Sequence, residues 1–193
     1  MSLLFTPFYL PLFGLTLLFV FSYMRQMPWA YKLQVFILVY CFTILLPTAL
    51  IHLYRQHRGW SLIELGSKER RMVPYIISIL CYFTCVYIMD RMHIPHFMGS
   101  IVTTALFIQI ICAMINVWWK VSTHTAAAGG VAGALYVFGR LFDFNPVWWL
   151  CLVIIIAGVL GTSRMILRQH SLLQVLAGFF VGLLCSLVGL VYL

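Results

Sequence analysis

The chain has 193 residues, of which 64% are hydrophobic and only 8% are charged. A soluble domain carries roughly 25% charged residues, so this chain cannot cover a water-facing surface and is not a soluble globular protein. Its 12 Lys and Arg outnumber 4 Asp and Glu, but they lie in short connections between apolar segments and form no long basic tract. This pattern argues against nucleic acid as a partner and favours anionic lipid head groups or anionic substrates.

Apolar segments separated by polar residues predict seven membrane-spanning helices, and six spans with a re-entrant segment are the alternative. A helix needs about 20 mostly apolar residues to cross the roughly 30 Å hydrocarbon layer. We therefore expect an all-α, polytopic membrane helix bundle with six or seven spans, forming a single transmembrane domain over residues 1–193. The predicted spans are Pro7–Met24, Leu33–Tyr54, Pro74–Met89, Phe97–Trp118, Thr125–Phe142, Pro146–Thr162 and Ser171–Leu193.

Small residues in the fifth and seventh predicted spans indicate close helix packing. Gly129 and Gly133 are spaced four apart, and so are Gly178 and Gly182. In lipid, small residues at this spacing allow two helix backbones to approach each other closely.

Polar residues gather in three groups, each at the start of a predicted span. In such an apolar chain, ionisable residues near membrane depth are functional candidates. The groups are Lys68, Glu69, Arg70 and Arg71 before Pro74; Lys120, Ser122 and His124; and Ser163, Arg164, Arg168, His170 and Gln174.

These three groups are expected on one face of the membrane. Two predicted spans separate the first group from the second, and two more separate the second from the third. An even number of crossings returns the chain to the same side. Helix N-termini carry free N–H groups and a partial positive charge, so several of them together with cations and two histidines predict a phosphate site. The alternatives are interfacial anchors for the cations, a helix cap for Ser122 and structural histidines.

At these residues the sequence resembles the type-2 phosphatidic-acid phosphatase superfamily, the histidine phosphatases of lipid phosphates. That superfamily uses Lys-x6-Arg-Pro, Pro-Ser-Gly-His and Ser-Arg-x5-His-x3-Asp. The third motif is clearest, with Ser163-Arg164, His170 and then Gln174 in place of Asp. The second keeps Ser122 and His124, and the first is loose around Lys68 to Pro74. The chain also resembles a compact bacterial branch of that superfamily, with Lys-x-Ser-x-His and a Gln after the last His.

The resemblance implies an integral membrane phosphatase that acts on a lipid phosphate or pyrophosphate in the bacterial inner (cytoplasmic) membrane. His170 would be the nucleophile that forms a phosphohistidine, and His124 would protonate the leaving oxygen and later activate water. Membrane lipids and the lipid-phosphate substrate would be its partners, and neither a metal nor another cofactor is implied. The residues implied to hold the phosphoryl oxygens are Lys68, Arg71, Ser122 and Arg164, with Lys120 and Arg70 as additions.

Gln174 is the main departure from the family pattern. On a helix, His170 and Gln174 would share a face, where an Asp would orient the His170 ring and stabilise its positive charge. A Gln carbonyl can orient the ring but supplies no negative charge. The alternatives are therefore an active enzyme, a catalytically silent protein that binds lipid phosphates, and a small transporter. His93 and His96 fall on the opposite face, where we expect interfacial residues and no metal site.

Overall fold

The computed structural model describes residues 7–58 and 68–192, and within these ranges the chain forms helices and no strands. Two short 3₁₀ helices, η1 (Pro7–Tyr9) and η2 (Tyr23–Gln26), and one π-helical turn, η3 (Cys41–Leu45), accompany the α-helices. The α-helices are α1 (Leu10–Phe21), α2 (Trp29–Tyr40), α3 (Leu46–Arg58), α4 (Lys68–Arg91), α5 (His96–Trp118), α6 (Thr123–Leu141), α7 (Val147–Ile166) and α8 (Leu172–Tyr192).

Among the described residues, five helical stretches are long and apolar enough to cross a membrane: Trp29–His57, which joins α2, η3 and α3, and the apolar lengths of α4, α5, α7 and α8. Helix α6 has 19 residues, many of them small, and it lies buried among the others. Helix α1 has only 12 residues, or about 18 Å at 1.5 Å per residue, which is shorter than the hydrocarbon layer. The all-α polytopic bundle with six or seven spans is confirmed. The number of spans is seven if the short helix α1 is counted as a span and six if it is not.

Proline and serine residues set several helix boundaries. Helices α2, α5 and α7 each begin directly after a proline, Pro28, Pro95 and Pro146 respectively. Helix α4 begins at Lys68, so Pro74 lies inside it, whereas its apolar length, Met72–Arg91, begins within two residues of the predicted start of the third span at Pro74. The Ser78 hydroxyl donates to the carbonyls of Pro74 and Tyr75, both at 2.9 Å, and so stabilises the helix after the proline.

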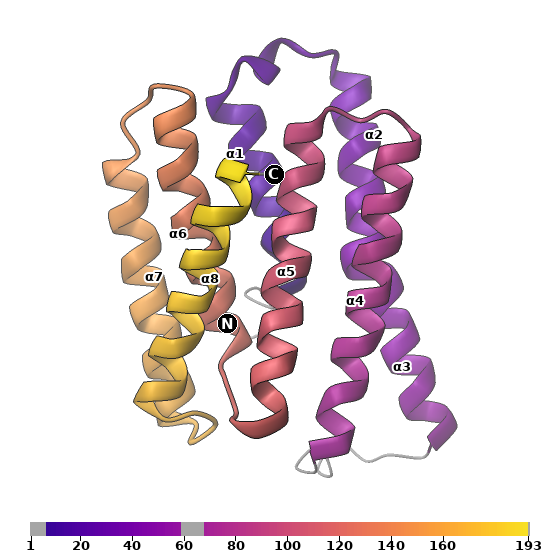
Figure 1. Ribbon diagram of the computed structural model, residues 1–193, viewed down its shortest axis with the longest axis vertical. Helices are drawn as coiled ribbons and strands as arrows, with labels where there is room; N and C mark the ends of the chain where they lie inside the picture. Colours follow the sequence, from indigo (N-terminus) through magenta and orange to yellow (C-terminus); the bar gives the residue numbers. More distant parts are fainter. Residues whose placement is uncertain (1–6, 59–67, 193) are drawn as a thin grey trace.

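The starts of α4, α6 and α8 lie at one end of the bundle, which is the lower end in Figure 1. The connections from α4 to α5 and from α6 to α7 lie at the upper end, so His93 is at the end opposite the three polar groups. The expectation that an even number of crossings brings the three groups to one end is therefore confirmed for their backbone positions.

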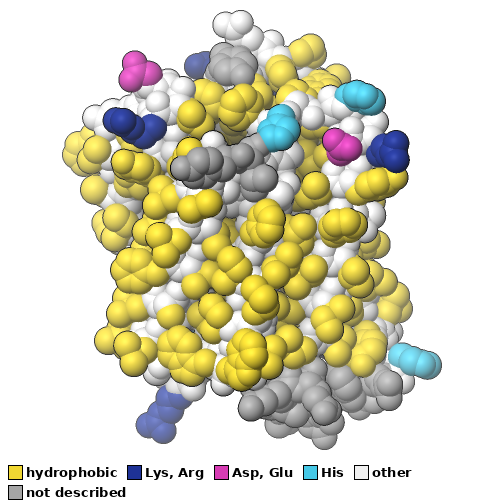
Figure 2. Space-filling view, viewed as in Figure 1, with side chains coloured by type: hydrophobic (Ala, Val, Ile, Leu, Met, Phe, Trp, Pro, Cys, Tyr) yellow, Lys and Arg dark blue, Asp and Glu magenta, His cyan; other side chains and the backbone are white. Residues whose placement is uncertain are grey.

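The surface matches a membrane environment. Figure 2 shows a broad apolar band around the middle of the molecule, with the charged and histidine side chains of this face near its two ends. Trp118 and Trp148, at ends of α5 and α7, are more than 80% exposed (81% and 84%). Tryptophan at such positions is typical of the membrane–water interface.

Helices α6 and α8 pack with their backbones in contact. A Cβ atom added to Gly182 would lie 1.8 Å from the carbonyl oxygen of Ala126, and one added to Gly129 would lie 2.0 Å from that of Phe179. Only glycine fits at these two positions. The predicted close packing of the two glycine-containing helices is confirmed, and it holds the starts of α6 and α8 together.

Candidate functional site

Hydrogen bonds join the start of α6 to the start of α8. The Ser122 N–H donates to the carbonyl of Gln174 (3.2 Å), and the Thr125 hydroxyl donates to the carbonyl of Val175 (2.9 Å). Gly178 makes this approach possible, because a Cβ there would lie 2.3 Å from the Ser122 carbonyl oxygen. The second and third polar groups are thus parts of one structural unit.

Ser122 is the N-cap of α6. Its hydroxyl accepts from the Thr125 N–H at 3.5 Å, and the residue is fully buried (0% exposed). Ser122 therefore caps α6, as the alternative interpretation of the sequence predicted. Phosphate binding by Ser122 stays a prediction.

Arg164 is a buried cation with unused hydrogen-bonding capacity. It lies in the last turn of α7 and is only 7% exposed. Its Nη1 donates to the side-chain oxygen of Gln169, whereas its Nη2 has no hydrogen-bond partner among the described residues. A buried donor without a partner is costly, and a buried charge is normally paired. A bound anion would supply the missing acceptor and the missing charge.

The turn after α7 explains how Gln169 comes to lie beside Arg164. Arg168 has a positive φ of 52°, the left-handed conformation that ends many helices. The Arg168 N–H donates to the Met165 carbonyl (2.9 Å), and the Gln169 N–H donates to the Arg164 carbonyl (3.1 Å). This pair of bonds is the Schellman motif, which folds the chain back over the last turn of the helix.

Gln169 connects two of the predicted phosphate-binding residues. Its main-chain carbonyl accepts from the Lys120 ammonium, and its side-chain carbonyl accepts from Arg164. Lys120 precedes α6 and Arg164 lies in the last turn of α7, so Gln169, directly before His170, holds cations from two segments. The sequence analysis missed Gln169. The only available signal was a polar residue inside the Ser-Arg-x5-His spacing.

The two histidines lie on this joined unit. His124 is in the first turn of α6, and His170 lies in the connection directly before α8; both are half-buried. Because Ser122 and Gln174 are bonded to each other, both histidines lie at the same end of the bundle, near the cations Lys120 and Arg164.

Gln174 has a structural role at the start of α8. Its side-chain carbonyl accepts from the Ser171 N–H (3.1 Å), and its main-chain carbonyl accepts from Ser122. Ser-x-x-Gln is the sequence of a capping box, in which the Gln side chain satisfies a free N–H at the helix start. The Gln174 amide thus has a hydrogen bond that a purely catalytic role would not require.

The backbone of the first polar group, Lys68 to Arg71, lies at the same end of the bundle as the starts of α6 and α8. Lys68, Arg70 and Arg71 belong to the first turn of α4, but their side chains lie outside the described part of the structure. Their predicted phosphate contacts therefore stay predictions.

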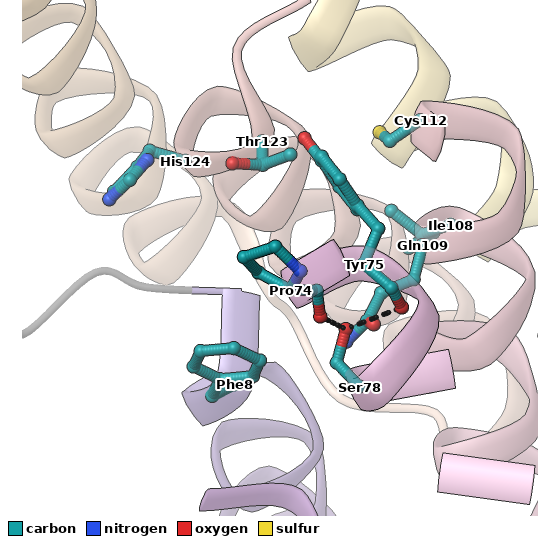
Figure 3. Close-up of a pocket in the computed structure, with 9 residues that line it drawn as sticks. All are labelled: Phe8, Pro74, Tyr75, Ser78, Ile108, Gln109, Cys112, Thr123 and His124. Carbon is teal, nitrogen blue, oxygen red and sulfur yellow. Dashed lines mark hydrogen bonds between the residues drawn. The ribbon is translucent and has the colours of Figure 1, made fainter. Parts of the chain in front are cut away.

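A cavity of about 250 Å³ opens beside His124. Helix α4 contributes Tyr75 and Ser78 to its wall, and α5 contributes Gln109 (Figure 3). The remaining lining residues are Phe8, Pro74, Ile108, Cys112, Thr123 and His124. The surface that these residues expose to the cavity is mainly apolar, so a hydrocarbon segment could contact it.

These features define a membrane-embedded helix bundle with two histidines and the cations Lys120 and Arg164 at one end. A family model described as the PAP2 superfamily matches residues 114–193, which include the second and third motifs. The resemblance to the type-2 phosphatidic-acid phosphatase superfamily is thereby confirmed over that segment. Neither the curated proteins nor the solved structures gave a match to the chain.

Proposed function

We propose that the protein is an integral membrane phosphatase that hydrolyses a lipid phosphate or lipid pyrophosphate through a phosphohistidine on His170. The observation that carries the proposal is the buried Arg164, whose Nη2 has no acceptor among the described residues. The PAP2 match and the apolar helices support a phosphatase-like activity on a lipid. The similarity to a compact bacterial branch supports the bacterial inner membrane as its location.

In the proposed reaction, the His170 imidazole attacks phosphorus while the bond from phosphorus to the lipid oxygen breaks. His124 gives its proton to that leaving oxygen. In the second step His124 takes a proton from water, the water oxygen attacks phosphorus, and the bond to His170 breaks, releasing phosphate. Because phosphoryl transfer depends mainly on positioning and charge stabilisation, fixed cations are the main contribution of the protein.

Arg164 and Lys120 would hold the phosphoryl oxygens during both steps. Arginine suits this role because its planar guanidinium can donate two parallel hydrogen bonds to a phosphate. The contacts with Gln169 fix both cations before the substrate binds. We assign the same role to Lys68, Arg70, Arg71 and Ser122 by the resemblance.

The second candidate is a catalytically silent protein that binds lipid phosphates. Gln174 favours it, because this residue cannot supply the negative charge of the family's Asp and its amide caps α8. Silent binding and catalysis predict the same affinity for a lipid phosphate but different release of phosphate.

The experiment measures phosphate release from a panel of lipid phosphates with EDTA present, for the original protein and for His170→Ala. His93→Ala is the matched control, because this histidine lies at the opposite end of the bundle. We expect release by the original and by His93→Ala, and none by His170→Ala. Binding without release by the folded original protein would replace the enzyme with the silent binder.

A further inference from the structure

The cavity beside His124 contains a buried amide with no use in the proposed reaction. Gln109 lies on α5 and is only 5% exposed, yet neither its side-chain oxygen nor its nitrogen makes a hydrogen bond to a described residue. The phenol of Tyr82 is close enough to interact with this amide, but its hydroxyl donates to the Phe8 carbonyl at 3.4 Å. Burying an amide without partners is costly, so a ligand that supplies them would be favoured.

Two other polar residues in the wall of the cavity already have partners. The Ser78 hydroxyl donates to carbonyls of its own helix, and the Tyr75 hydroxyl accepts from the Asn116 amide at 2.9 Å. Figure 3 shows Tyr75, Ser78 and Gln109 along one side of the cavity, with Phe8 and His124 across from them. Gln109 therefore differs from both residues: even a contact with the Tyr82 phenol can use at most one of the hydrogen-bonding positions of its amide, and no other described residue satisfies the rest.

The depth of Gln109 fits the linker of a lipid phosphate. Gln109 lies roughly 14 Å along α5 from Trp118, at 1.5 Å per residue, whereas His124 lies in the first turn of α6 at that same end. A phosphate near the histidines would thus place the next few bonds of its lipid along the cavity toward Gln109. The volume of about 250 Å³ is below the roughly 300–1,000 Å³ of sites for whole drug-sized ligands, so the cavity takes one segment of a lipid.

We propose that this cavity binds the linker segment of the lipid substrate, and that Gln109 hydrogen-bonds an ester, amide or hydroxyl group of that linker. The favoured substrates are thus acylated lipid phosphates, and polyprenyl phosphates are disfavoured. A polyprenyl chain carries no hydrogen-bonding group beyond its phosphate, so it would leave the Gln109 amide buried against hydrocarbon. Sites that hydrogen-bond a substrate group discriminate strongly against an analogue that lacks it.

This inference rests on the proposed function, and it is tested by comparing two substrates. The kcat/KM for a diacylglycerol phosphate and for a polyprenyl phosphate is measured in the same detergent micelles, and their relative affinities are measured by competition for binding. We expect the original protein to prefer the diacylglycerol phosphate. In Gln109→Leu we expect the ratio of the two kcat/KM values, and of the two affinities, to fall by about tenfold or more.

Two further variants make the test specific. Gln109→Met keeps the length of the side chain without its amide, and it serves if the leucine variant does not fold. Thr104→Val is the matched control, because Thr104 is on the same helix, is buried (3% exposed) and has a hydroxyl with no partner among the described residues, but does not line the cavity. We expect it to leave both ratios unchanged.

The outcomes separate this proposal from the proposed function. Equal ratios in the original protein and both Gln109 variants, or a preference of the original for the polyprenyl phosphate, would overturn the assignment of Gln109. Absence of phosphate release from either lipid would overturn the phosphatase. The competition measurement would still decide the selectivity of the cavity in that case.

Discussion

Replacing Arg164 is the most direct test of the anion site. Arg164→Met removes the guanidinium and keeps much of the apolar length of the side chain. Removal of one donor that stabilises developing charge lowers kcat by about 10²–10³-fold in enzymes where it has been measured. Arg164 is a buried cation whose Nη2 has no hydrogen-bond partner among the described residues, so we expect a loss of that size in kcat/KM.

The stability of the same variant should behave differently from its activity. The substitution removes one hydrogen bond, to Gln169, but it also removes a buried nitrogen without a partner. Each of these terms amounts to about 1–3 kcal/mol, and they have opposite signs. We therefore expect little change in the thermal midpoint in detergent.

Ligand-dependent stability gives the second readout. A ligand that binds only the folded state stabilises it by RT ln(1 + [L]/Kd), or about 2.7 kcal/mol at 100 times Kd. Vanadate or inorganic phosphate should raise the thermal midpoint of the original protein and fail to raise that of Arg164→Met. Arg140→Met is the control, because Arg140 is exposed in the last turn of α6, away from the site. Full activity and full vanadate stabilisation in Arg164→Met would refute the anion site.

Three further substitutions test the parts that support the site. Gln169→Met should lower kcat/KM by about tenfold to a hundredfold, because Arg164 loses a charge-assisted bond of about 1.5–3 kcal/mol; activity equal to the original would contradict this role. Gln174→Leu should lower the thermal midpoint by the equivalent of about 1 kcal/mol, whereas Gln174→Glu should keep the cap; equal midpoints for both variants would contradict it. Gly182→Ala should destabilise by about 1–3 kcal/mol or more, because its Cβ would meet a backbone carbonyl at 1.8 Å, whereas Gly158→Ala has no neighbour within 4 Å and should be neutral in thermal unfolding.

The sequence predicted the overall arrangement because that arrangement depends on simple features. Apolar length predicted the helices, and the even number of crossings predicted that Lys120 and Arg164 share one end of the bundle. The glycine spacing predicted the contact of α6 with α8, which Gly129 and Gly182 make through their missing Cβ atoms. Apolar length and glycine spacing are local in sequence, and the shared end follows from the number of membrane crossings alone. None of these predictions required a known tertiary structure.

The contacts of the site could not be predicted in the same way. Gln169 reaches Arg164 because Arg168, which is not a glycine, adopts a positive φ, and no sequence pattern marks that choice. The cavity depends on side chains from three helices and η1, which only tertiary packing brings together. The cap by Gln174 was readable as Ser-x-x-Gln, but the comparison with the family's Asp directed the interpretation of Gln174 toward His170 alone.

The geometry around Gln169 also bears on how the proposed site would work with Gln174 in place of an Asp. Both Lys120 and Arg164 donate to one residue, so their positive charges are fixed in place before a phosphate arrives. Fixed donors stabilise a transition state well because they need little reorganisation during the reaction. A substrate phosphate could accept from Nη2 of Arg164, which has no partner among the described residues, while the bond from Nη1 to Gln169 persists. The cations would then compensate in part for the missing negative charge at position 174, since they stabilise the phosphoryl group directly, without acting through the nucleophile.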